Sequence, residues 1–262
     1  MIRLVALATV LATATPALAA DHEDAQPSWG ISFRTGPYKP SMGTNARYYN
    51  AYYTSPTDHS LFKNHPLMTE VEIDYYILRE FGLLGPMVEL GMWGVSGATR
   101  ACVHPDASGT PVKGPCSSTE ILTPGVSQSG TDSTKLTAYP ITLGAIYKAD
   151  LIKRYTVIPL VPYAKGGLTW FTWRNTVGGK LSHYLGHPAE GATLGVRGTV
   201  GLAFNLDFIE PNAASRARMS TGIADSYLFG EMSFLWVDGF GNNKRLNFSG
   251  QTVQVGFAVD FL

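Results

Sequence analysis

Near its carboxyl end the chain reads TVQVGFAVDF over Thr252–Phe261, an almost unbroken alternation of apolar residues with polar or small ones. Successive side chains of a strand point to opposite faces, so Val253, Val255 and Phe257 share one face. About ten residues is also the length that a tilted strand needs to cross a bilayer. The segment therefore predicts a membrane-spanning β-strand with one apolar face.

The same alternation recurs in seven earlier segments. They are Trp29–Arg34, Val71–Ile77, Met87–Gly94, Tyr139–Tyr147, Leu160–Trp170, Leu194–Phe204 and Leu228–Trp236. Many of the apolar stripes include Trp or Tyr near an end, as the aromatic girdles of membrane barrels do, and long connections mostly alternate with short ones. The sequence thus predicts an all-β fold, an eight-stranded antiparallel up-and-down transmembrane β-barrel with long extracellular loops and short periplasmic turns.

The alternation alone would also fit a soluble sandwich or a lipocalin-like barrel whose apolar face points inward. Low charge favours the membrane barrel, because charged residues make up only 15% of the 262-residue chain. The faces opposite the apolar stripes carry charges of both signs. With 20 Lys and Arg against 20 Asp and Glu, the formal net charge is zero, and no nucleic-acid partner is expected.

One connection breaks the alternation of loop lengths, because the segment from Asp207 to Gly222 is long where a short turn is due. Pro211 suits the first position of a helix, and the residues that follow it, Asn212–Ala217, can continue one. The sequence predicts a short helix in this connection.

The first residues have the pattern of a secretory signal peptide. Arg3 supplies a positive charge, Leu4–Ala14 is a short apolar run, and Ala17-Leu18-Ala19 fits a small-x-small cleavage site. We expect residues 1–19 to be removed and residues 20–262 to form one barrel domain in the outer membrane of a Gram-negative bacterium. Its expected partners are outer-membrane lipid and the outer-membrane insertion machinery.

The polar faces of the predicted strands carry most of the chemistry. If the apolar faces contact lipid, the lumen receives Arg34, Glu70, Glu72, Asp74, Glu89, Lys165, Arg197, Glu231 and Asp260, together with Gln254. An eight-stranded barrel is just wide enough for its own side chains, and unpaired charge there would be costly. We expect a salt-bridge network that plugs the lumen, and the alternative is a proton or ion pathway. Six acids face three bases in this set, so three acids are left over.

A cluster of tyrosines lies in the first long connection, at Tyr48, Tyr49, Tyr52 and Tyr53. Tyrosine offers a large contact area at a low entropy cost, which suits a surface-recognition role. The alternative is that these rings pack the loop onto the rim of the barrel.

Other residues give little sign of an active site. His183 and His187 have the spacing of helical metal ligands, but Gly186 and Pro188 disfavour a helix there. The pair Ser182-His183 has no obvious orienting acid beyond Glu190. We expect no catalytic residue, no metal and no cofactor.

Several further segments carry a family resemblance, namely Glu72–Tyr75 with Leu78–Gly82, Ile158–Leu168, Gly198–Asp207 and Tyr227–Gly241. On these segments the chain resembles a group of predicted outer-membrane β-barrel proteins of myxobacteria without assigned biochemistry. The resemblance spans most of the chain from Trp29 to Leu262, but not the loop around Cys102. It implies a fold and a location, similar in design to other small eight-stranded outer-membrane barrels, and no catalytic residues.

Together these patterns predict a monomeric, non-enzymatic outer-membrane barrel with a structural or surface-recognition role and a plugged lumen. Two alternatives stay open. One is a narrow channel or transporter for small or apolar solutes, and the other is a lipid-modifying enzyme with its site at the rim.

Cys102 and Cys116 are the only cysteines of the chain, and export favours a disulfide between them. The segment between them, which includes His104–Pro111, has the composition of a loop, so the bridge would staple a loop. Closing a loop of about 15 residues stabilises by roughly 3 kcal/mol in the entropic treatment.

We predict that Cys102 and Cys116 are bridged in the exported protein and that reduction leaves the barrel folded. Peptide mass mapping under non-reducing conditions should find the two cysteines in one linked fragment. Two free thiols in exported protein would refute the bridge.

Overall fold

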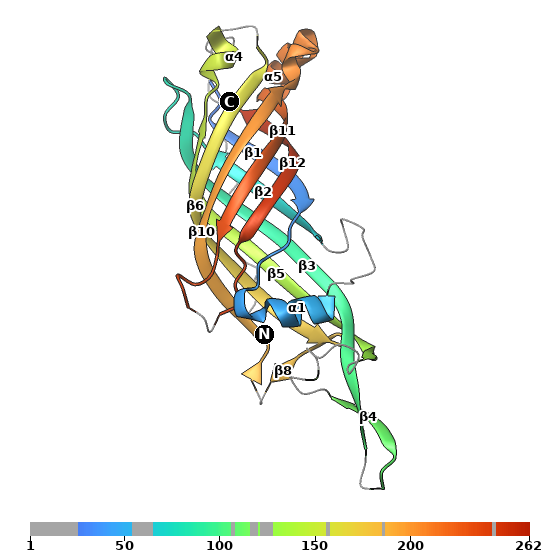
Figure 1. Ribbon diagram of the computed structural model, residues 1–262. Helices are drawn as coiled ribbons and strands as arrows, with labels where there is room; N and C mark the ends of the chain where they lie inside the picture. Colours follow the sequence, from blue (N-terminus) through green and yellow to red (C-terminus); the bar gives the residue numbers. More distant parts are fainter. Residues whose placement is uncertain are drawn as a thin grey trace.

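The computed structural model describes residues 26–53, 65–105, 108–115, 120, 128–155, 158–184, 187–242 and 245–262. Within these residues eight antiparallel strands form a closed barrel (Figure 1). They are β1 (Trp29–Pro37), β2 (Leu67–Tyr75), β3 (Leu83–Pro105), β5 (Gln128–Lys148), β6 (Leu160–Val177), β10 (Glu190–Asn205), β11 (Ile223–Trp236) and β12 (Gly250–Phe261). Each strand pairs with the next, and β1 pairs with β12, which closes the sheet. The predicted eight-stranded antiparallel barrel is confirmed.

Three strands are much longer than the predicted ten or so residues. β3 has 23 residues, β5 has 21 and β6 has 18. The predicted segments Met87–Gly94 and Tyr139–Tyr147 were therefore too short, because β3 and β5 stay paired as far as Ala101 and Gln128. The backbone ladder continues past the apolar stripe, since strand pairing needs only main-chain groups. Likewise β6 extends to Val177, past Trp170, where the predicted segment ends.

The two ends of the barrel differ. At the terminus end, β1 begins beside the end of β12, where the rings of Trp29 and Phe261 stack with centroids 4.1 Å apart. This end also carries α4 (Leu151–Tyr155), η2 (Leu206–Phe208) and α5 (Pro211–Thr221) (Figure 1). The opposite, loop end carries η1 (Gly43–Asn45), α1 (Ala46–Tyr53), β4 (Pro111–Pro115), β7 (Lys180–Leu181), β8 (His183–Tyr184) and β9 (His187–Pro188).

Helix α5 confirms the helix predicted after Asp207. Pro211 lies in its first turn, where the missing N–H costs nothing. The helix ends at Gly222, whose φ of 71° is left-handed and whose N–H donates to the carbonyl of Arg218 at 3.1 Å. Glycine adopts this conformation without a steric penalty.

Side chains alternate between the inside and the outside of the barrel along every strand. The outward positions are apolar and exposed, as at Phe33 (51%), Leu90 (53%), Val200 (56%) and Val255 (63%). The inward positions hold the buried polar residues and two apolar clusters. Among the described residues, no helix has the length and apolar character needed to span a membrane. The predicted signal peptide, residues 1–19, lies outside the described residues, as does Cys116.

The two apolar clusters lie inside the barrel, one toward each end. The loop-end cluster contains Tyr38, Met42, Tyr49, Met68, Trp93, Val95, Leu136, Ala138, Phe171, Leu235, Val237 and Phe248. The terminus-end cluster contains Tyr76, Leu83, Met87, Ile146, Val161, Tyr163, Ala203, Tyr227, Phe229 and Ala258. Charged side chains occupy the space between them.

We predict that Gly144→Val destabilises the barrel, whereas Gly198→Val is tolerated. A Cβ on Gly144 would lie 2.2 Å from the carbonyl oxygen of Gly166, but one on Gly198 meets only the Trp236 ring at 3.7 Å. Forced overpacking costs about 1–3 kcal/mol. Urea unfolding of the refolded barrel should show the loss for Gly144→Val alone, and equal midpoints for both variants would contradict the close approach of β5 to β6.

Candidate functional site

Arg34 lies at the centre of the barrel interior and is fully buried. On β1 it faces Glu70 of β2 in the antiparallel register, and its Nε donates to Glu70 Oε2 at 3.2 Å. One of its terminal nitrogens donates to Glu72 Oε2 at 2.8 Å and also pairs with Glu89 of β3. A single guanidinium thus joins carboxylates from two neighbouring strands.

Two further cations complete this layer. Arg197 of β10 pairs with Glu70 at 2.6 Å and with Glu89, and Lys165 of β6 lies 2.9 Å from both Glu72 and Glu231. Glu231 of β11 also lies 3.2 Å from Arg34 Nε. We call the seven residues the central belt, namely Arg34, Glu70, Glu72, Glu89, Lys165, Arg197 and Glu231. Six strands on all sides of the barrel contribute to it, and every member is at least 94% buried.

Neutral polar side chains join the central belt to the last strand. Gln254 of β12 donates to Glu70 Oε2 at 2.9 Å and accepts from Arg197 at 2.9 Å. Arg197 also donates to the hydroxyl of Ser233 at 2.9 Å. These contacts satisfy groups that the ion pairs alone leave unpaired, as buried polar groups require.

A second ionic group lies nearer the terminus end, around Lys148. Its Nζ is 2.9 Å from Asp260 and 3.8 Å from Asp74, and the Tyr76 hydroxyl donates to Asp260 at 2.9 Å. Sequence reasoning missed Lys148, because the predicted strand ended at Tyr147. The alternation could have identified Lys148, because it follows the outward-facing Tyr147 and successive strand side chains point to opposite faces. Lys148 is a fourth inward base, which the predicted set of three bases did not include.

The interior between these layers has almost no free volume. A cavity of about 20 Å³ lies between the central belt and Lys148, lined by Glu72, Asp74 and Tyr163 among others. That is room for about one water molecule. Asp74 lines this space, and its Oδ1 has no hydrogen-bond partner in the described part of the chain, so one water there would satisfy it.

Aromatic rings close the interior on the loop side of the central belt. Phe171 and Phe248 stack with centroids 4.9 Å apart, and the Trp93 indole N–H donates to the carbonyl of Tyr38 at 3.1 Å. All four residues are fully buried. Sequence reasoning did not identify this cluster, because its members occupy inward positions that the apolar-out pattern reserves for polar residues.

Helix α1 lies across the mouth of the barrel at the loop end (Figure 1). Tyr49 is buried against the Trp93 ring, and the Tyr53 hydroxyl hydrogen-bonds Thr134 and Asn175, each at 3.1 Å. Burial raises the pKa of both phenols above the ordinary value, so both stay neutral. These two tyrosines pack the loop onto the rim, whereas Tyr52 is half-buried beside Tyr53 and the side chain of Tyr48 lies outside the described part.

Two other sequence features can be placed in part. Cys102 is buried near the end of β3, but Cys116 lies outside the described residues, so their bridge stays a prediction. His183 and His187 belong to the paired strands β8 and β9, which agrees with the expectation that they do not share a helix. His183 Nδ1 lies 3.0 Å from the carbonyl oxygen of Leu181. In the described part of the chain, no three His, Cys, Asp or Glu side chains are grouped as metal ligands.

Comparison with solved structures returns outer-membrane proteins. The structure of Neisserial surface protein A has 12% identity and a TM-score of 0.42, covering 89% of this chain and 97% of that one. Ail of Yersinia pestis, solved with the heparin analogue sucrose octasulfate, has 9% identity, a TM-score of 0.41 and the same coverage. The outer membrane protease OmpT of Escherichia coli has 9% identity and a TM-score of 0.32, covering 90% and 94%.

These similarities describe general barrel architecture, and no functional residue is transferred from them. No protein-family model and no curated protein sequence matches the chain. The resemblance to myxobacterial barrel proteins therefore stays a hypothesis, and the fold rests on the strand pairing itself.

We predict that Arg197→Met destabilises the barrel by about 3–5 kcal/mol, because it removes one of the two buried cations that Glu70 and Glu89 share and leaves Arg34 alone to pair both. Lys180→Met is the control, since Lys180 is exposed at the loop end. Adding Glu89→Gln to Arg197→Met should restore part of the loss. Urea unfolding measures all four proteins, and an Arg197→Met midpoint equal to the control would contradict the pairing.

Proposed function

We propose that this protein is a monomeric, non-enzymatic barrel of a bacterial outer membrane, with a sealed interior and a loop end that faces outward. The observation that carries the proposal is the inverted distribution of its side chains. Charged residues fill the inside of a closed sheet, while apolar side chains cover the outside.

The outer wall is suited to lipid and not to water. Exposed Phe, Leu, Val, Ile and Met side chains occur on every strand of the wall, including Phe33, Leu90, Leu143, Val200 and Val255. Monomeric soluble proteins seldom expose continuous apolar patches larger than a few hundred Å². A closed barrel can face lipid because no backbone group of its sheet is left without a partner. Outer-membrane lipid and the insertion machinery are the partners that this placement requires.

The closed interior argues for a structural or recognition role over transport. The central belt and the loop-end aromatic cluster cross the lumen, and the cavity between the ionic layers holds about one water molecule. The surface left for recognition is the loop end, where β3 and β5 project beyond the barrel and β4 pairs with β3 (Figure 1). Tyr52 and the predicted Cys102–Cys116 loop belong to this end.

We expect the protein to stay in the membrane fraction after washing with high salt and alkaline carbonate, and to be released by detergent. A peripheral or soluble exported protein would be released by carbonate. Release of the full-length protein without detergent would end the membrane proposal in favour of a soluble exported barrel.

We expect no stable open pore when the purified monomer is inserted in a planar bilayer. Lys165 and the two arginines of the central belt cross the space that an ion would need. Insertion is verified in parallel by protease protection of the barrel. Steady ion-selective conductance from protein shown to be inserted would favour the narrow-channel alternative.

A further inference from the structure

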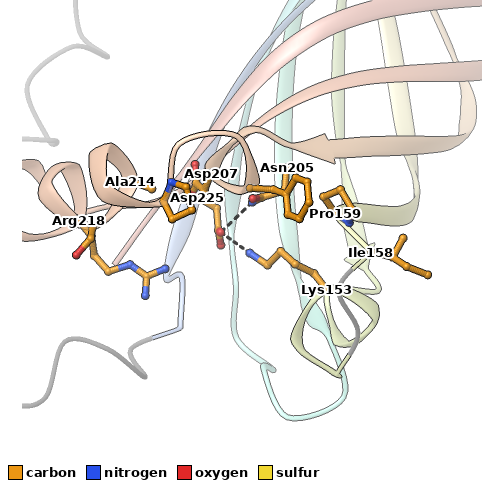
Figure 2. Close-up of a pocket in the computed structure, with 11 residues that line it drawn as sticks. Lys153, Ile158, Pro159, Asn205, Asp207, Ala214, Arg218 and Asp225 are labelled. Carbon is orange, nitrogen blue, oxygen red and sulfur yellow. Dashed lines mark hydrogen bonds and ion pairs between the residues drawn. The ribbon is translucent and has the colours of Figure 1, made fainter.

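A polar pocket of about 390 Å³ lies at the terminus end between α5, η2 and α4 (Figure 2). Four charged residues line it, namely Lys153 of α4, Asp207 of η2, Arg218 of α5 and Asp225 of β11. Two are cationic and two are acidic, so the formal charge of the pocket is balanced.

The acidic groups of this pocket are held in place by neighbours. Asp225 pairs with Lys153 and accepts from Asn205 Nδ2 at 3.0 Å (Figure 2). Asp207 accepts from the Ser226 hydroxyl at 2.7 Å. Arg218 donates to the carbonyl of Ala224 at 2.8 Å, which holds its side chain at the wall of the pocket. The pocket therefore presents opposite charges at preset positions.

An apolar slot of about 350 Å³ continues from this pocket on the other side of α5. Ala213, Ala214 and Ala217 form its helix side, while Phe257 and Val259 of β12 form its barrel side. The slot shares Asp207 and Ala214 with the polar pocket, so the two spaces meet at these residues.

A trough of about 590 Å³ follows along the outer wall of the barrel. It passes over Gly230, where no atom lies closer than 4.0 Å to an added Cβ, between Leu202, Leu228 and Val255. The trough shares Phe257 with the slot. Two residues of the trough are neighbours in sequence of residues in the polar pocket. Leu160 follows Pro159, and Phe204 precedes Asn205. A polar site thus leads into two apolar ones on the lipid-facing wall.

Resting on the membrane placement proposed above, we infer that these three spaces bind one glycerophospholipid whose zwitterionic headgroup carries a primary ammonium. Its phosphate would lie against Arg218 and Lys153, and its ammonium against Asp207 and Asp225. The slot and the trough would hold the acyl chains.

Charge complementarity selects this headgroup over the other classes. An anionic headgroup would leave the two carboxylates without a cation of the ligand and close to its phosphate. A quaternary ammonium has no N–H to donate, so it cannot make the charge-assisted hydrogen bonds that a primary ammonium makes to a carboxylate. The exposed side chains of Phe208 (60%) and Ile209 (66%) lie beside the pocket, where they can enter the same leaflet.

The test is native mass spectrometry of the full barrel released from nanodiscs that contain equal parts of phosphatidylethanolamine, phosphatidylcholine and phosphatidylglycerol. We expect one retained phosphatidylethanolamine per barrel, enriched by about tenfold over the other two lipids, as one strong charge-assisted pair would give. Arg218→Gln and Gly230→Leu should each lower the retained fraction, the first through the headgroup and the second by filling the trough.

Matched controls separate these effects from general damage. Arg216→Gln changes another arginine of α5, whose Nε donates only to its own helix at Asn212. Gly198→Leu fills an outward glycine away from the trough, with the nearest atom at 3.7 Å. Both should retain lipid like the wild type.

Three outcomes would overturn the site. They are retention in proportion to the nanodisc composition, preference for phosphatidylglycerol, and equal loss in the controls and the two site variants. Failure of the wild type to insert into nanodiscs at all would instead overturn the membrane placement, so the two failures are distinguishable.

Discussion

The interior of an eight-stranded barrel has room for side chains but not for a column of water, so each charge inside it must be paired by another strand. Arg34 meets this constraint by joining Glu70, Glu72 and Glu89, and Lys165 and Arg197 meet it from the opposite wall. Strands that are distant in the sequence are thereby held in one register. A slip by one residue would turn these charges outward onto the apolar outer face.

The paired interior also explains how the two ends of the molecule can differ. Because ionic layers and aromatic rings fill the lumen, neither end has to provide a gate. The loop end is free to project as β3, β4 and β5, with α1 packed over the mouth through Tyr49 and Tyr53. At the terminus end, the long connection after β10 instead forms α5 beside the outer wall, where it creates pockets against the apolar side chains of β12.

Much of the fold could be predicted because membrane barrels invert the usual burial pattern along every strand. Alternation alone assigned Arg34, Lys165 and Arg197 to the inside, where the structure places them. It missed Lys148 and the lengths of β3 and β5, because apolar stripes mark only the lipid-facing part of a strand. It also missed the inward aromatic rings of Trp93 and Phe171, since their packing depends on residues such as Phe248 that are far away in the sequence. The pockets around α5 depend on how a helix docks, which no local pattern specifies.

If the paired charges and rings seal the lumen, a cysteine placed inside the barrel should be inaccessible to reagents in water. Thr142→Cys places one on the inward face of β5 beside Glu89. Both native cysteines are replaced by serine, and Ser108→Cys at the exposed loop end serves as the reactive control. We expect a water-soluble methanethiosulfonate reagent to modify the cysteine at 108 rapidly and to leave the one at 142 unmodified from either side of the bilayer. Rapid modification at 142 in the folded, inserted barrel would show a water-filled lumen and refute the sealed interior.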